Sequence, residues 1–121
     1  MASNKSFQFG PIALTATYTT NLLNPATLTG GVNGGSGACF ILLKHLKIVN
    51  KTAAPATFRL YRGATGGNAA GTELAYDVTV PAYDYKDLWG AWRFDSTDFL
   101  VGGASAGTTL TISGEGEIGV A

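Results

Sequence analysis

The stretch CFILLKHLKIVN, residues 39–50, is the most hydrophobic segment of the chain and decides its fold class. Phe40, Leu42, Leu46 and Ile48 share one parity within it. Because side chains two residues apart lie on the same side of a β-strand, this spacing predicts one long strand with these four side chains on one face.

The segments on either side repeat the pattern between turn signals. Pro55 marks the first turn, because proline cannot donate within a β-ladder, and Thr57–Arg62 then alternates again with Phe58 and Leu60 on one side. Further strands are expected at Ile12–Thr19, Leu74–Val80, Tyr83–Phe94, Phe99–Val101 and Thr108–Val120. No long segment has the apolar stripe of a helix. The sequence predicts an all-β fold, either a single antiparallel β-sandwich of jelly-roll-like form or a small barrel, with about seven to eight strands.

The 121 residues are enough for one domain, and no internal repeat divides them. Residues 1–9 are polar and show no strand period, so they are interpreted as an extended N-terminal arm, with a frayed chain end as the alternative. Residues 21–37 are rich in Gly, Asn and Thr and are expected to form a long surface loop.

Charge is sparse and balanced. Charged residues make up 13% of the chain, and eight basic residues offset eight acidic ones. A typical soluble domain carries about twice that share, and zero net charge gives little protection against self-association. We therefore expect a symmetric homo-oligomer, with a sparsely charged monomer as the alternative. The absence of a basic patch argues against nucleic acid as a partner.

The chain is expected to be made and kept in a reducing cytoplasm. Cys39 is the only cysteine, so no disulfide can form within one chain. Residues 1–14 lack the apolar run of a signal peptide. The most apolar run, Ala38–Leu43, is too short to span a bilayer, so no membrane partner is expected.

No set of catalytic or metal-binding residues stands out. His45 is the only histidine, and Cys39 lies six residues before it on the same expected strand, about 20 Å away at ~3.3 Å per residue. Cys39 is expected to be a small buried hydrophobe and His45 a surface residue of a half-exposed strand. One histidine and one cysteine cannot supply a tetrahedral zinc site within one chain. We expect no enzyme activity, no cofactor and no metal.

Two loops contain residue types that could bind a ligand. Asp95 and Asp98 frame a tight turn that could offer oxygens to Ca²⁺, but aspartates at the ends of a turn usually cap their own backbone. The glycine-rich loop at residues 63–71 lacks the Lys-Ser/Thr and the helix that a phosphate loop needs.

The aromatic cluster between residues 83 and 92 is the strongest candidate for a binding surface. Parity puts Tyr83, Tyr85 and Trp89 on one face, and Trp92 on the other face with Leu88 and Phe94. One face is expected in the core, and the other could be exposed to a sugar or a protein partner. The alternative is that both tryptophans lie in the core of a small sandwich.

The region from His45 to Glu117 resembles a pattern that recurs in small structural proteins of tailed-bacteriophage virions. The resemblance rests on the order of several short motifs, each of low specificity alone. These motifs are Leu46–Asn50, Phe58–Gly67, Gly71–Leu74, Val80–Ala82, Asp98–Gly103, Leu110–Ile112 and Gly114–Gly116. Residues 1–37 lie outside the matched region.

The resemblance implies a capsid decoration protein, a β-rich trimer that clamps neighbouring capsid subunits from the outside. Its partners would be the major capsid protein and further copies of itself, and its location the virion exterior. The alternative is a carbohydrate- or receptor-binding module of the tail or a fibre. Exposed, coplanar aromatic rings would favour sugar binding, and buried or subunit-contacting rings would favour assembly. The candidate interface residues are Phe7, Phe9, Asn24, Pro25, Tyr83, Tyr85, Trp89 and Trp92.

Overall fold

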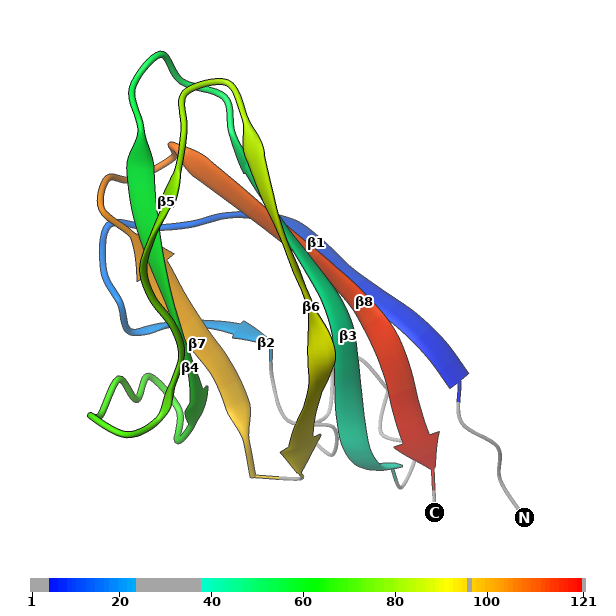
Figure 1. The fold of residues 1–121 in the computed structure, drawn as a ribbon. Coiled ribbons are helices and arrows are strands. Elements are labelled where there is room, and N and C mark those ends of the chain that lie inside the picture. The colour runs from blue at the N-terminus through cyan, green and yellow to red at the C-terminus, as the bar shows by residue number, and fades with distance from the viewer. Residues whose placement is uncertain (1–4, 24–37, 96, 121) are drawn as a thin grey trace.

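Two four-stranded antiparallel sheets make up the fold (Figure 1). The computed structural model describes residues 5–23, 38–95 and 97–120, and this part of the chain forms strands and no helix, so no described helix could cross a membrane. The strands are β1 (Lys5–Ala13), β2 (Thr20–Leu23), β3 (Ala38–Asn50), β4 (Ala56–Gly63), β5 (Glu73–Val80), β6 (Tyr85–Asp95), β7 (Phe99–Ala104) and β8 (Leu110–Val120). Their order is β1-β8-β3-β6 in one sheet and β2-β7-β4-β5 in the other. The predicted β-sandwich is confirmed, with the eight strands of a jelly roll.

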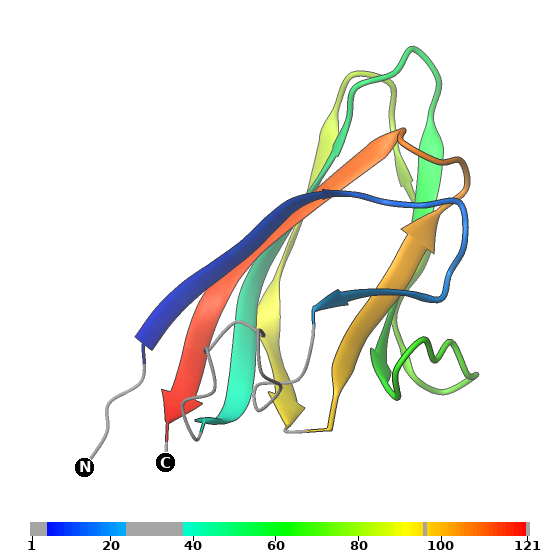
Figure 2. The same ribbon diagram turned by 180° about the vertical axis from the view of Figure 1, so that it is seen from behind.

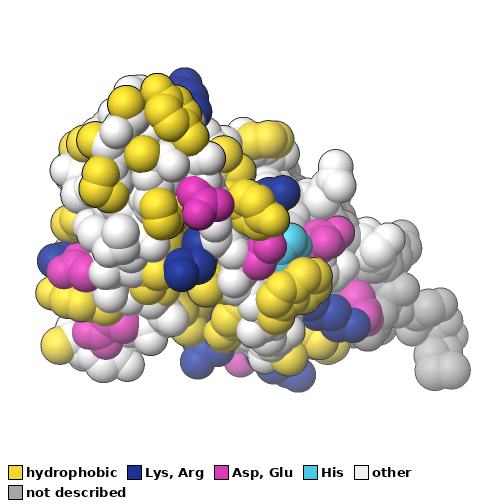
Figure 3. All heavy atoms as spheres, turned by 45° about the horizontal axis from the view of Figure 1, so that its top comes forward, with side chains coloured by type: hydrophobic (Ala, Val, Ile, Leu, Met, Phe, Trp, Pro, Cys, Tyr) yellow, Lys and Arg dark blue, Asp and Glu magenta, His cyan; other side chains and the backbone are white. Residues whose placement is uncertain are grey.

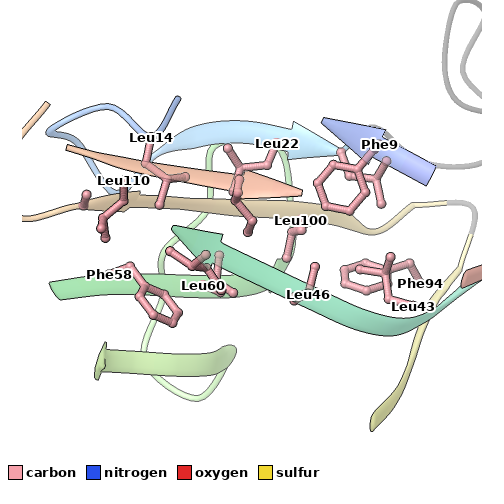
Figure 4. Packing of buried hydrophobic residues seen from close by; sticks show 14 of the residues in the cluster. Phe9, Leu14, Leu22, Leu43, Leu46, Phe58, Leu60, Phe94, Leu100 and Leu110 are labelled. Atoms are coloured by element: carbon pink, nitrogen blue, oxygen red, sulfur yellow. The ribbon is translucent and has the colours of Figure 1, made fainter. Parts of the chain in front are cut away.

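The core fills the space between the two sheets (Figure 4). The first sheet contributes Phe9, Ile41, Leu43, Leu46, Ile48, Phe94, Leu110, Ile112 and Ile118, and the second contributes Leu22, Leu23, Phe58, Leu60, Val80 and Leu100. Burying one such side chain stabilises the fold by about 1.5–3 kcal/mol relative to leaving it exposed. The core is therefore large enough to hold the sheets together without a disulfide.

The N-terminal strand begins earlier than predicted. Lys5–Ala13 forms β1 and pairs with β8, so residues 5–9 belong to the sheet and do not form a free arm, while residues 1–4 lie outside the described part of the chain. The register shifts between Phe9 and Ile12. Gly10 accommodates this shift, because its φ is +78° and a Cβ atom there would lie 2.5 Å from the carbonyl oxygen of Ile112.

The strand predicted at residues 12–19 ends at Ala13, and the chain then crosses to the second sheet (Figure 2). The Leu14 amide donates to the carbonyl of Leu110 in the first sheet (2.8 Å), and the Thr15 carbonyl accepts from Ala104 in the second (2.8 Å). The chain passes so close to Gly103 that a Cβ atom there would collide with the Thr17 carbonyl. Residues 14–19 therefore connect the two sheets, and their sequence alternation does not correspond to a strand.

The predicted loop at residues 21–37 is partly a strand. Thr20–Leu23 forms β2, which pairs with β7 and buries Leu22 and Leu23. Residues 24–37 lie outside the described part of the chain, so the structure places neither Asn24 nor Pro25.

The parity predicted for residues 39–50 changes in the middle of β3. Ile41 and Leu43 are buried, and after a register shift with both neighbouring strands the next buried side chain is Leu46. Phe40 and Leu42, which were grouped with Leu46, are half-buried. Leu43 and Leu46 are three residues apart, so both can face the core only because an irregularity interrupts the alternation between them.

Candidate functional site

A row of side chains crosses the outer face of the first sheet. The cross-strand register places Gln8 of β1 opposite Glu115 of β8, Glu115 opposite His45 of β3, and His45 opposite Trp89 of β6. Directly opposed residues in an antiparallel sheet have their Cβ atoms about 5 Å apart. The four strands of this sheet therefore bring these polar and aromatic groups together in one row.

The register shift in β3 decides that His45 takes part in this row. Strict alternation from buried Leu43 would turn His45 toward the core, together with Leu43 itself. The irregularity between Leu43 and His45 instead leaves both Lys44 and His45 outside the core, and inward alternation resumes at Leu46.

His45 is held by three neighbours. Its Nε2 atom lies 2.8 Å from Oδ1 of Asp87, and its Nδ1 atom lies 3.4 Å from Oε1 of Glu115. The imidazole also stacks on the indole of Trp89, with ring centroids 4.0 Å apart and planes 19° from parallel. These contacts leave only 15% of the His45 side chain exposed. We call His45, Asp87, Trp89 and Glu115 the His45 cluster.

The His45 cluster lies at the molecular surface. In Figure 3 the chain's one histidine, in cyan, has acidic side chains on both sides and hydrophobic surface next to it. A salt bridge between Lys44 and Glu117 flanks the cluster on one side. On the other side the ammonium group of Lys47 lies 4.5 Å from the ring centre of Tyr85, a cation–π contact.

Two shallow hollows border the cluster. The larger, about 360 Å³, is lined by Ser6, Lys44, His45, Trp89, Glu115, Gly116 and Glu117. The smaller, about 230 Å³, is lined by Gln8, His45, Lys47, Ser113, Gly114 and Glu115. The residues that line both hollows belong to strands of one sheet, so the pairing of these strands fixes the backbone positions of the lining residues.

The cluster does not form a metal centre. Within the described ranges, no group of three or more His, Cys, Asp or Glu side chains is arranged to hold a metal ion. Cys39 and His45 lie on the one strand β3, as predicted. The charged side chains of the cluster can form hydrogen bonds to a ligand, and the Trp89 ring offers an apolar surface beside them. This combination is suited to binding a ligand.

The predicted division of the aromatic residues is confirmed. Tyr83, Tyr85 and Trp89 are exposed, whereas Phe94 is buried and Trp92 is half-buried and packs against the core. Tyr83 lies in the connection between β5 and β6, where its φ of 55° is unusual for a residue other than glycine.

The other candidate interface residues take different positions. Phe9 packs in the core with 8% of its surface exposed, so its side chain contacts other residues of this chain and presents little surface to a partner. Phe7 lies on β1 opposite Gly116. Interface roles for the exposed aromatic residues remain predictions.

A second charged group lies on the other sheet. The Nε and Nη2 atoms of Arg59 donate to the two carboxylate oxygens of Asp77 at 2.7 and 3.2 Å. The guanidinium also lies 4.3 and 4.2 Å from the ring centres of Tyr18 and Tyr76. The hydrogen bond to Asp77 raises the pKa of Arg59, and the bond from Arg59 lowers the pKa of Asp77. The guanidinium of Arg59 and the carboxylate of Asp77 are partners of each other, so we interpret this cluster as structural.

The Asp95–Asp98 turn follows the predicted capping arrangement. The Asp98 amide donates to the Asp95 carbonyl at 3.0 Å, and the Asp95 amide donates to Oδ2 of Asp98 at 2.9 Å. Oδ1 of Asp95 accepts from Nε of Arg93. The Asp98 carboxylate therefore caps the backbone of its own turn, whereas the Asp95 carboxylate pairs with the side chain of Arg93.

The His45 cluster was not predicted from the sequence. His45 was expected to be an ordinary surface residue, and no pairing of acidic residues was singled out. The available signal was the presence of Asp87 and Trp89 two residues apart on a predicted strand, which places both on one face. Which side chains lie opposite Asp87 and Trp89 on the neighbouring strand depends on the register between the two strands. Strand alternation does not specify this register.

Comparison with known proteins gives likenesses of fold. No protein-family model matches the sequence, and no curated protein matches it. Tobacco streak virus coat protein, in a C2 crystal form, is similar over 97% of this chain and 85% of that chain, with a TM-score of 0.47 and 11% identity. The dimer of the same coat protein has a TM-score of 0.44 and 13% identity over the same shares. Eiger TNF from S. frugiperda is similar over 99% of this chain and 94% of that chain, with a TM-score of 0.47 and 11% identity.

Proposed function

We propose that this chain is a structural virion protein that decorates and stabilises an assembled phage capsid as a symmetric, trimeric oligomer. Its partners in this role are further copies of itself and the major capsid protein. Its place is the capsid exterior, after assembly in the host cytoplasm. The role requires no catalysis. The observation that carries the proposal is a group of exposed aromatic side chains along two free strand edges.

The exposed aromatic residues lie close together in the chain. Tyr76 on β5, Tyr83 in the connection and Tyr85 on β6 are 56%, 74% and 52% exposed. We call these three residues the edge aromatics. Large aromatic side chains are enriched at protein interfaces, where they act as anchors. Their exposure on a chain with only 13% charged residues supports a covered surface in the working state.

Within the part of the chain that the structure describes, β5 and β6 each pair with another strand on one side only. β5 ends the order of one sheet and β6 ends the order of the other, and residues 81–84 join them directly. A free strand edge offers unpaired N–H and C=O groups to another chain. Closed symmetry among copies would cover these edges and limit further association.

Decoration would stabilise a shell through mass action. A protein that binds only the assembled lattice shifts the equilibrium toward that lattice. Many copies with modest individual contacts add up through multivalency. Eight-stranded jelly rolls serve in viral capsid and lectin domains alike, so the proposal rests on the edge aromatics and the motif resemblance, and the fold adds only an analogy.

The first test is the mass of the purified protein by light scattering. We expect three times the 12.5 kDa mass of one chain. The double variant Tyr83→Asn, Tyr85→Thr should shift the protein toward monomer. Asparagine adopts the positive φ of position 83 readily, and threonine suits a strand, so the fold should survive.

The second test is co-sedimentation with empty capsids of the virus that encodes the chain. Wild type should bind and raise the temperature at which the capsids break down, and the double variant should do neither. Gln8→Thr, an exposed change on β1 at the opposite edge of the same sheet, is the matched control and should behave as wild type. A wild-type monomer with no affinity for the capsids would refute the proposal.

A further inference from the structure

We propose that the larger hollow beside Trp89 is a binding site for a neutral pyranose unit of a glycan. The inference concerns a site on the outer face of the first sheet and stands whether or not the chain decorates a capsid. It rests on three features of that face: a fixed aromatic platform, a rim of hydrogen-bonding groups, and an excess of acidic over basic side chains.

The platform is the indole of Trp89. Although His45 stacks against its ring at 4.0 Å, 71% of the Trp89 surface is exposed. The apolar C–H face of a pyranose ring can cover such a surface, which removes apolar area from water. The side chain opposite Trp89 in the sheet is His45, and its stacked ring covers only part of the indole.

The platform is also held in position before any ligand arrives. Asp87 contacts one ring nitrogen of His45 at 2.8 Å and Glu115 approaches the other at 3.4 Å. The imidazole is therefore fixed from two neighbouring strands, and it supports the indole stacked on it. A side chain that is already ordered loses less conformational entropy on binding, which favours affinity.

The rim of the hollow offers donors and acceptors to sugar hydroxyl groups. Ser6 and Lys44 can donate hydrogen bonds, and the carboxylates of Glu115 and Glu117 can accept them. The combination of an aromatic ring with a few convergent polar groups is typical of small-ligand sites. At about 360 Å³ the hollow is at the small end of such sites, so it suits one ring of a longer glycan.

The charge of the hollow narrows the ligand class. Gly116 on β8 lines the hollow with its backbone, because a Cβ atom there would point at the backbone of Leu42 and Leu43 on β3. Two glutamates and one lysine line the hollow, with Lys44 in a salt bridge to Glu117, and Asp87 contacts His45 beside it. Because the carboxylates would repel another carboxylate, the hollow favours a neutral sugar over a uronic or sialic acid.

The test is titration of the full chain with three neutral hexasaccharides, namely cellohexaose, maltohexaose and chitohexaose, by isothermal calorimetry and tryptophan fluorescence. We expect saturable binding of at least one of them and none of polygalacturonate. Trp89→Ala should weaken that binding by about tenfold or more, the effect of losing roughly 1.4 kcal/mol. Trp89→Phe, which keeps a ring, should restore part of it.

The controls separate this proposal from the proposed assembly. Tyr83→Asn changes an exposed aromatic residue that does not line the hollow and should keep the wild-type sugar affinity. Circular dichroism should show an unchanged β spectrum for each variant. Failure of all three neutral probes to bind, binding of polygalacturonate alone, or wild-type affinity in Trp89→Ala would each overturn the proposal. None of these results depends on capsid attachment, which co-sedimentation measures separately.

Discussion

At the scale of single residues, the buried side chain of Asn50 connects three segments. Its amide nitrogen donates to the carbonyls of Ala54 (2.8 Å) and Val80 (3.1 Å), and its Oδ1 accepts from the backbone and the hydroxyl of Thr52 (2.9 and 2.7 Å). The end of β3 is thus linked to the following turn and to the end of β5. A buried amide is tolerated because its hydrogen bonds are made within the protein.

Asn50→Ala should lower the free energy of unfolding by about 2–3 kcal/mol, because it leaves the Val80 carbonyl and the Thr52 amide without these partners. Urea denaturation measures the change. Asn68→Ala, at an exposed position in the β4–β5 connection, is the matched control and should change stability by less than about 0.5 kcal/mol. Equal stability of the two variants would show that the Asn50 network contributes little.

At the scale of elements, residues 5–13 form a strand whose first half was not predicted from the sequence. Phe7 and Phe9 alternate with Ser6 and Gln8, but four residues are too few to establish a strand period, and the polar character of the first nine residues favoured an arm. The pairing of β1 with β8 supplies the partner that satisfies the backbone of this short segment. Strand formation here depends on a segment more than a hundred residues away in the sequence.

Deletion of residues 2–9 should destabilise the fold, because it removes most of β1 together with the buried ring of Phe9. Loss of a buried phenylalanine alone costs about 3–5 kcal/mol. Thermal unfolding followed by circular dichroism measures the effect. Deletion of residues 2–4, which removes no residue of β1, should keep the wild-type midpoint. If both deletions unfold at the wild-type midpoint, β1 contributes nothing measurable to stability.

At the scale of the whole molecule, two sheets packed over an apolar core leave two surfaces of different character. The outer face of the first sheet carries the His45 cluster, and the adjoining edges of β5 and β6 carry the edge aromatics. With no net charge, electrostatic repulsion between copies is weak. The molecule can therefore associate through its edges while the hollow near Gly116 stays a separate feature of the sheet.

The proposed association makes thermal stability depend on protein concentration. If only folded chains associate, the unfolding midpoint should rise as the concentration is raised. Differential scanning calorimetry over a hundredfold range of concentration measures this rise. The variant Tyr83→Asn, Tyr85→Thr should have a midpoint that does not change with concentration, and Gln8→Thr should follow wild type. A constant midpoint for wild type would argue against association within that range.

The sequence by itself determined the fold class and the two faces of β6. Alternation is a local property, because consecutive side chains of any extended segment point to opposite sides. It therefore predicted an all-β sandwich and the division of Tyr85 and Trp89 from Phe94 between the two faces of one strand, whereas the structure shows which of these faces is buried. It also predicted the capping turn at Asp95–Asp98, whose hydrogen bonds lie within four residues.

Only the tertiary structure decided the register between strands and the place where alternation breaks. The shift between Leu43 and His45 arises because β3 pairs with β8 on one side and β6 on the other, and both partners shift register at the same point. That shift turns His45 outward and sets it between Asp87, Glu115 and Trp89. His45, Glu115 and the Asp87–Trp89 pair come from three strands that are far apart in the sequence. A period of two does not specify which strand lies opposite which. The packing of the two sheets makes that choice.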